Sequence, residues 1–491
     1  MRTFYTIIVP LLFFFIIFNG CERDEVIREN IVLQFSTDTV YFDTVLTTLG
    51  SVTRYFRIYN TYDQPIEIGN IGLARGDDSY FRLNLDGREG RSFNNVQIPQ
   101  KDSLYMFVEV TIDPLDENNP LLIKDSIIFS ASSMLQDVKL IAYGQDVHLL
   151  DGEVFETQTW TGDKPYLIVN SAALDSNEVL TIDPGAHIYL TPASSLIIWG
   201  RMEAKGTYEN PIVFTGARFD GRFEESAGQW GTIFFDEKST GNILEHVVIK
   251  NAVAGIQVGY PDEENETSVE LRNCMILNSS ALGVYAFNST INAYNTIIAD
   301  CGSLALYLQM GGTYNFYHCT ISNISAFYPD FYQDDYKPRG LPSVFFTNYY
   351  DWFDLDDDYR IYEVTYPEDL DVNFVNSIIY GSRASEVYYD TLARAGLEYQ
   401  FDHCLLKMHE DSLSIFDSTR LVSMILNQDP GFLNDSIALG DYDFQLADTS
   451  KAIDAGSLEA IEGIEQLNTD IMGNPRINNG LPDLGAYEFS N

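Results

Sequence analysis

Apolar and polar positions alternate in short blocks between residues 242 and 408, and one block pattern occurs six times. Each block places an apolar residue two positions before an Asn or His, and an Ile or Leu three positions after it. The Asn or His positions are His246, Asn273, Asn295, His318, Asn376 and His403. They are separated by 27, 22, 23, 58 and 27 residues. A period in the twenties combined with two-residue alternation predicts a solenoid of short strands.

The alternation restarts out of phase at each Asn or His, which predicts a corner there. Asn, Asp and His are the residues other than Gly that best tolerate a positive φ, so we expect a left-handed corner residue between two short strands. A turn of about 22 residues is typical of a parallel β-helix, in which successive turns hydrogen-bond and like residues stack inside. The expected interior column is Ile249, Ile276, Ile298, Ile321, Ile379 and Leu406.

This alignment also interprets residues that could carry chemistry. The three histidines of the repeat occupy the corner that Asn holds elsewhere, which favours turn geometry over catalysis. Cys274, Cys319 and Cys404 align with small interior residues and are expected to be free and unreactive. Cys274 and Cys319 lie whole turns apart, beyond the reach of a disulfide.

Between residues 31 and 148 the pattern changes to seven or eight short alternating runs separated by turn residues. This texture predicts an immunoglobulin-like β-sandwich. Residues 54–60 followed by 64–68 resemble the start of sandwich modules found near the N-terminus of surface proteins. The resemblance implies a spacer or docking module, and a glycan-binding sandwich is the alternative.

The first 20 residues read as a targeting segment. Arg2 precedes an apolar run at 7–18, which is long enough for a signal-peptide core and shorter than the ~20 residues that span a bilayer. Gly20 before Cys21 resembles the bacterial lipoprotein processing box, which implies cleavage before Cys21 and lipidation of its thiol. The acidic run 22–25 resembles the export tag of Bacteroidota-type surface lipoproteins. The resemblance implies an outer-membrane protein held by lipid, facing the cell exterior, with residues 21–30 as a tether.

Residues 179–190, 196–207, 210–215 and 230–235 carry glycines at turn positions and Ile, Val or Phe at interior positions. They resemble the opening turns of bacterial right-handed parallel β-helix proteins of the pectate-lyase-like fold. The fold class is therefore expected to be all-β, with the sandwich followed by a right-handed parallel β-helix over residues 149–450. The motifs are specific for the fold and leave the reaction open.

Residues 450–456, 468–476 and 482–489 are similar to the terminal module of many secreted bacterial β-helix proteins. The resemblance implies that residues 451–491 form a cap over the last open turn, since a solenoid needs its end covered. Asp454, Asp470, Arg476 and Asp483 are expected to form a buried network that fixes this cap, because one Arg can bridge several carboxylates.

The 58-residue spacing indicates an insertion over residues 325–371, rich in aromatic and acidic side chains. A long insertion in a solenoid is a loop on one face and is often a binding face. The candidate ligand-binding residues are Tyr328, Tyr332, Tyr349, Tyr350, Trp352 and Phe353. Their rings could stack on sugars, or they could pack against the solenoid and anchor the loop. Asp354 and the acids at 356–358 offer a weak signal for Ca²⁺, and no other cofactor is expected.

The chain has 72 Asp and Glu against 29 Lys and Arg, a formal charge of −43 over 491 residues. This excludes nucleic acid as a natural partner and argues against an unaided polyanionic substrate, because phosphate binding needs positive charge. The remaining partners are the membrane, through the N-terminal lipid, and a polysaccharide or surface protein.

Two functions stay open. The first is a non-catalytic surface lipoprotein that binds glycan or a partner protein. The second is a β-helix polysaccharide lyase or glycoside hydrolase, although the Gly-His-Gly and Arg-x-Lys motifs typical of the hydrolases are missing. No catalytic residue is assigned, and the acids considered are Asp300, Asp371, Asp390 and Asp402. Outward acids beside Lys or Arg in one groove would favour the enzyme, whereas a groove of Tyr, Phe and Asn would favour binding.

Overall fold

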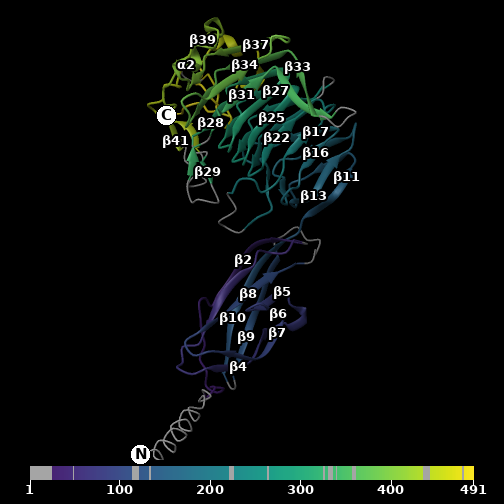
Figure 1. Cartoon of the computed structure of the whole chain (residues 1–491), viewed down its shortest axis with the longest axis vertical. Helices are drawn as coiled ribbons and strands as arrows, with labels where there is room; N and C mark the ends of the chain where they lie inside the picture. Colours follow the sequence, from purple (N-terminus) through teal and green to yellow (C-terminus); the bar gives the residue numbers. More distant parts are fainter. Residues whose placement is uncertain are drawn as a thin grey trace, which may run out of the picture. The chain divides into compact units, whose positions relative to one another are not determined.

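The computed structural model describes residues 25–47, 49–112, 121–131, 134–219, 226–261, 265–324, 327–329, 336–338, 340–355, 361–434, 443–477 and 480–490. The chain forms two compact units, Met1–Asp146 and Val147–Asn491 (Figure 1). Both are built almost entirely from strands, which confirms the predicted all-β class. Within the described residues, no helix is long and apolar enough to cross a membrane. The predicted targeting segment and Cys21 lie outside the described residues.

The first unit is a sandwich of two five-stranded sheets, as predicted. One sheet has the order β1-β3-β8-β5-β6, with bounds Gln34–Phe35, Arg54–Tyr59, Ser103–Val110, Phe81–Leu85 and Arg88–Gly90. The other has the order β2-β10-β9-β4-β7, with bounds Thr39–Leu46, Met134–Gln145, Leu121–Ala131, Ile66–Leu73 and Ser92–Ile98. A 3-10 helix, η1, spans Gly76–Asp78. Alternate residues of most strands fill one shared apolar core, as the two-residue period requires, whereas β6 contributes none.

The second unit is a parallel β-helix, whose wound sheet contains 26 strands. Three strands make most turns, so each strand pairs with the one a turn later. The first turns use β11 (His148–Phe155), β12 (Gln158–Trp160), β13 (Tyr166–Leu174), β14 (Val179–Ile182) and β15 (His187–Leu190). The later strands fall on three faces, which we number in chain order.

Face 1 contains β16 (Leu196–Ile198), β19 (Ile233–Phe235), β22 (Ala254–Val258), the first half of β25 (Leu282–Tyr294), the first half of β27 (Leu304–Tyr317), β31 (Val344–Thr347) and β36 (Val387–Asp390). Face 2 contains β17 (Arg201–Lys205), β20 (Asn242–Glu245), β23 (Ser268–Arg272), the second halves of β25 and β27, β34 (Leu370–Val375), β37 (Leu397–Asp402) and β39 (Leu421–Val422). Face 3 contains β18 (Ile212–Gly216), β21 (Val247–Lys250), β24 (Met275–Leu277), β26 (Ile297–Ala299), β28 (Thr320–Asn323), β35 (Ile378–Gly381), β38 (Leu405–Leu406) and β40 (Ile425–Leu426).

The corners between faces 2 and 3 are left-handed, as predicted. All six Asn or His residues of the repeat have φ between 47° and 53°. Their side chains also bond from turn to turn: Asn273 Nδ2 donates to His246 Nε2 at 3.3 Å, and Asn295 Nδ2 donates to Asn273 Oδ1 at 3.0 Å. The predicted interior column is buried, with every member at most 1% exposed.

The cysteines of the repeat are interior fillers, which confirms their predicted role. Cys274, Cys319 and Cys404 are buried and free. Burial raises the pKa of each thiol to about 12, so the reactive thiolate is suppressed.

The segment predicted as one insertion is divided in two. Strand β31 lies inside it and belongs to face 1, because the buried Val344 and Phe346 continue the interior pattern there. Before β31 stands the hairpin β29 (Phe327–Pro329) and β30 (Tyr336–Pro338). After it stands the hairpin β32 (Tyr349–Leu355) and β33 (Ile361–Pro367), and β34 resumes the solenoid at Leu370.

The C-terminal tail contains β41 (Phe432–Asn434), β42 (Asp443–Leu446), η4 (Glu459–Ile461) and η5 (Glu465–Leu467). Its apolar residues pack on outward side chains of face 3, among them Ile297, Ile378 and Leu405. The described contacts of the tail therefore run along the flank of the solenoid, whereas the sequence led us to expect contacts across its last turn. The last turns also carry α2 (Glu410–Leu413) and η2 (Ser418–Arg420), and between them Phe416 packs on the interior rings.

Candidate ligand-binding groove

An aromatic ladder runs along the outside of face 1. Tyr285, Tyr307, Phe345 and Tyr388 are aligned from turn to turn by the register of their parallel strands. Their ring centroids are 5.3, 5.5 and 5.6 Å apart, with interplanar angles of 16°, 24° and 30°. Parallel in-register pairing places equivalent side chains one strand apart, so the ladder follows from the fold. Three of its residues lie outside the insertion that drew attention in the sequence.

The hairpin β32–β33 rises beside this ladder. Tyr350 meets Phe287 of β25 edge to face, with centroids 5.3 Å apart. Tyr349 donates a hydrogen bond from its hydroxyl to Asp390 Oδ2 at 2.8 Å. Thr365 Oγ1 donates to Asp351 Oδ1 at 2.6 Å and ties the two strands of the hairpin together. These contacts fix the base of the hairpin against face 1.

The ladder and the hairpin enclose a groove of about 370 Å³. Its lining residues are Tyr285, Tyr307, Gln309, Phe345, Thr347, Tyr349, Tyr350 and Asp351. This lining combines aromatic rings with hydroxyl, amide and carboxylate groups, and it contains one acid and no Lys or Arg. Such a surface offers hydrogen bonds and apolar contact, the two interactions that a neutral polyhydroxyl ligand needs.

The phenols of the groove act as neutral hydrogen-bonding groups. Burial raises the pKa of Tyr285, and its hydroxyl donates to Gln309 Oε1 at 2.9 Å. Burial also raises the pKa of Tyr307. The pKa of Tyr349 rises to about 12 through burial and through the nearby Asp390 carboxylate. All three hydroxyls therefore keep their protons near neutral pH.

Stacking within the ladder limits which rings can receive a ligand. Tyr307 and Phe345 each have a neighbouring ring on both sides, so they present their edges to the groove. Trp352 and Tyr388 are the more exposed rings, at 42% and 47%. A sugar face can therefore stack most readily on Trp352 or Tyr388.

The candidates from the sequence divide accordingly. Tyr349 and Tyr350 line the groove, and Tyr350 also anchors the hairpin, so both interpretations of the aromatic insertion apply to it. Trp352 is exposed on the same strand, 6.2 Å from the Tyr350 ring. Tyr332 and the side chains of Tyr328 and Phe353 lie outside the described part of the chain.

The acids considered for catalysis are not brought together. Asp300 is a buried corner residue with a φ of 56°. Asp371 and Asp402 lie on face 2, where Asp371 accepts from Asn373 Nδ2 at 2.9 Å. Asp402 Oδ1 lies 2.7 Å from His403 Nδ1. Asp390 alone of the four borders the groove, through Tyr349.

A second polar hollow of about 370 Å³ lies where face 2 meets the tail, and it contains a cation beside acids. Arg272 Nε lies 2.8 Å from Glu270 Oε1, and its Nη1 lies 3.7 Å from Glu245 Oε2. The bond with Glu270 raises the pKa of Arg272, so this guanidinium stays charged and paired. An Arg held this way is poorly suited to act as a base.

The described residues contain no cluster of three or more His, Cys, Asp or Glu that could hold a metal ion. The acidic run considered for Ca²⁺ falls elsewhere: the side chain of Asp354 and the acids at 356–358 lie outside the described residues.

Three of the four residues predicted to fix the tail, Asp470, Arg476 and Asp483, are buried together, whereas Asp454 is exposed and joins them only through its backbone N–H. Arg476 is fully buried and donates from Nη2 to Asn295 Oδ1 at 2.7 Å and to the Gly485 and Ala486 carbonyls at 3.0 Å. Its Nη1 lies 3.4 Å from Glu488 Oε2. Asn295 is a corner of the solenoid, so this Arg fastens the tail to the flank.

The predicted aspartates act mainly on backbone groups. Asp470 accepts from the Met472 and Asn474 N–H groups at 2.9 and 2.7 Å. Asp483 accepts from the Asp454 N–H at 2.7 Å. The acid that meets the guanidinium directly is Glu488, which the sequence did not single out, although it stands in the same terminal motif.

No protein-family model matches this sequence, and no curated protein matches it. Among solved structures, a family 123 glycoside hydrolase from Clostridium perfringens, analysed for glycolipid glycan hydrolysis, is similar to 25% of this chain, with 9% identity and a TM-score of 0.18. The similarity covers 26% of the hydrolase, so this chain spans about a quarter of it. A likeness this low carries no argument, and the function has to be inferred from the chain's own geometry.

Proposed function

We propose that this chain is a cell-surface lipoprotein whose β-helix binds an extended, largely neutral glycan in the groove of face 1 without cleaving it. The observation that carries the proposal is the aromatic ladder walled by the β32–β33 hairpin. The ladder repeats once per turn, and an extended polysaccharide also repeats at regular intervals. A long ligand can therefore make the same contact at successive turns.

The lining supports a neutral ligand. Glycan hydroxyls can pair with the phenols, Gln309 and Asp351, while apolar ring faces cover Trp352 or Tyr388. Without a cation in the groove, a polyanionic chain would meet only the negative field of the protein.

The anchor belongs to the same proposal. Lipidation at Cys21, followed by the acidic run 22–25, would hold the protein in the outer membrane and direct it to the exterior. A glycan-binding solenoid carried at the surface would then meet polysaccharide outside the cell.

A glycan array probed with the protein lacking residues 1–21 tests the proposal, with and without Ca²⁺, followed by product analysis on every ligand bound. We expect binding without cleavage that is weakened in Trp352→Ala and in Tyr388→Ala. Tyr208→Ala is the matched control, because Tyr208 is similarly exposed at 49% but has no ring contact with a described residue of the groove lining, whereas Trp352 and Tyr388 each have one. Cleaved products would contradict the proposal, and absence of glycan binding would favour a surface protein as partner.

The second candidate is a β-helix polysaccharide lyase or glycoside hydrolase. The specific observation in its favour is that Asp351 and Asp390 both lie next to Tyr349, one at the groove lining and one hydrogen-bonded to its hydroxyl. Two carboxylates flanking a glycosidic bond are the requirement for hydrolysis. If products appear, Asp390→Asn should abolish them and leave binding intact.

A further inference from the structure

The outer face of one sandwich sheet carries a second aromatic surface. Tyr55 of β3 and Tyr105 and Phe107 of β8 lie 5.7–6.0 Å apart, centroid to centroid. The Arg57 guanidinium lies over the Tyr105 ring, 4.5 Å from its centroid. Tyr55 is 61% exposed, so this group of rings is open to solvent.

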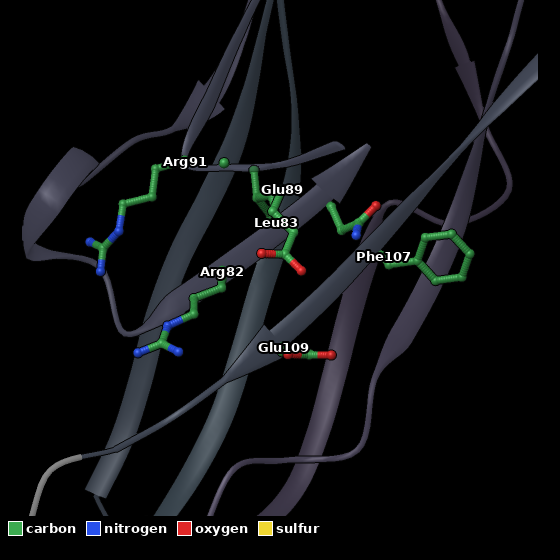
Figure 2. Close-up of a pocket in the computed structure, with 8 residues that line it drawn as sticks. Arg82, Leu83, Glu89, Arg91, Phe107 and Glu109 are labelled. Carbon is green, nitrogen blue, oxygen red and sulfur yellow. The ribbon is translucent and has the colours of Figure 1, made fainter. Parts of the chain in front are cut away.

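A pocket of about 450 Å³ adjoins Phe107 on this face. It is lined by Arg82, Leu83, Asn84, Glu89, Gly90, Arg91, Phe107 and Glu109. Figure 2 shows the Arg82 and Arg91 guanidinium groups on one side of it and the Glu89 and Glu109 carboxylates on the other. The volume falls within the range of small-ligand sites.

One of the two arginines is fixed in place by the backbone. Arg91 Nη1 donates to the Gly76 and Ser79 carbonyls, each at 3.2 Å, and also to that of Asp77. These bonds occupy a single nitrogen, so the other N–H groups of the guanidinium remain for a ligand. An Arg held this way needs little further ordering when an anion binds.

The other arginine is uncommitted. The Arg82 side chain is exposed and makes no hydrogen bond or ion pair with the described residues. It stands opposite Glu109 in the pairing of β5 with β8, yet that carboxylate accepts from Thr53 Oγ1 at 2.5 Å. The pocket therefore offers two guanidinium groups for an anion, and two carboxylates and an amide for hydroxyls.

We propose that this pocket binds a uronic-acid residue of an acidic polysaccharide. Its carboxylate would pair with Arg82 and Arg91, its hydroxyls with Glu89, Glu109 and Asn84, and its apolar ring face with Phe107. The charge of −43 disfavours a polyanion over the protein as a whole, and these two arginines supply the local aid that such a ligand needs. A phosphate ion would bring its charge against the same two carboxylates and would offer them at most one or two P–OH donors.

Calorimetric titration of the full chain in detergent with tetragalacturonic acid tests the assignment, with its methyl ester as the uncharged probe. We expect the ester to bind at least tenfold more weakly than the acid. Arg82→Gln should weaken binding of the acid at least tenfold. Arg88→Gln, an exposed Arg of the same hairpin outside the pocket lining, should change it less than twofold. Equal binding of acid and ester, an unchanged Arg82→Gln, or no binding of the acid would overturn the proposal.

Trp352→Ala separates this site from the groove of face 1. We expect it to leave binding of tetragalacturonic acid unchanged, even though it weakens the neutral-glycan binding proposed above. Loss of tetragalacturonate binding in Trp352→Ala would assign the acid to the groove and overturn the sandwich site. The ester comparison uses the unmodified chain, so the test remains decisive if a variant does not fold.

Discussion

Faces 1 and 3 of the solenoid are formed by the same turns, but one is open to solvent and the other is covered by the C-terminal tail. On face 3 the outward residues include Ile297, Ile378 and Leu405, and the C-terminal tail buries them. On face 1 the outward column is aromatic and borders an open groove. A parallel solenoid repeats every outward position, so each face becomes one uniform stripe. The difference teaches that what covers a stripe decides whether it is part of the packed structure or stays open for the binding proposed above.

The largest expected effect is removal of the tail's attachment. Arg476→Met should destabilise tail docking by about 3–5 kcal/mol, because it leaves the Glu488 carboxylate and the side-chain amide oxygen of Asn295 buried without the guanidinium. Hydrogen exchange of the tail amides in urea measures this. Arg201→Met, a change at a half-exposed Arg of face 2, should cost less than about 0.5 kcal/mol. Equal effects of the two would contradict the latch role of Arg476.

Truncating one outward side chain on face 3 should lower the free energy of unfolding more than truncating one on face 1. Ile378→Ala should lower the free energy of unfolding by about 2–4 kcal/mol, since the residue is fully buried between β35 and the tail. Tyr388→Ala, at a ring that is 47% exposed on face 1, should cost about 1 kcal/mol or less. Urea denaturation followed by circular dichroism compares them. A larger loss for Tyr388 would mean that face 1 is also structural.

The docking of the C-terminal tail on face 3 should depend on pH. Burial raises the pKa of Glu488 to about 7, from an unfolded value of 4.5, so the folded tail binds the extra proton between these pH values. Docking should therefore weaken by roughly 1–3 kcal/mol as the pH rises from about 4.5 to 7. Limited proteolysis of the tail across this range measures the change, and Glu488→Gln should remove it.

The buried His318 should give the opposite pH dependence of stability. Burial holds the pKa of His318 well below 6.5, so the neutral ring is favoured and stability is lost as the pH falls below that value. His318→Asn keeps the corner geometry and should remove this second dependence. A pH profile unchanged in both variants would show that neither group controls docking.

The smallest effect concerns the open stripe. Trp352→Ala should weaken binding of the neutral glycan about tenfold and leave the urea midpoint unchanged, because the ring is 42% exposed. Affinity titration with the best array ligand measures it. A shift in stability without a change in affinity would mean that Trp352 only supports the hairpin.

The sequence predicted most of the fold because its strongest signals are local. The corner residues, such as Asn273 and His318, adopt a positive φ. Asn and His tolerate this conformation, so the residue type alone indicates the corner. The buried strand β31 was missed for a related reason. It stands between two hairpins on face 1, which the corner motif joining faces 2 and 3 does not cover.

The site was harder to predict, because its parts are distant along the chain. Tyr349, Tyr350 and Trp352 were found from an aromatic segment, whereas Tyr285 and Tyr388 gave no such signal. The role of Glu488 was not predicted either, because its partner Arg476 lies twelve residues earlier in irregular structure.

By itself the sequence determined the all-β class, the corners, the interior column and the unreactive cysteines, because each depends on backbone preference and two-residue periodicity. Only the tertiary structure decided which outward columns are covered and which rings stack. Strand register aligns Tyr285, Tyr307 and Phe345 across three turns, and the tail lies along face 3 because a buried guanidinium meets a corner amide there. Such pairings join residues far apart in the chain, where no local pattern records them.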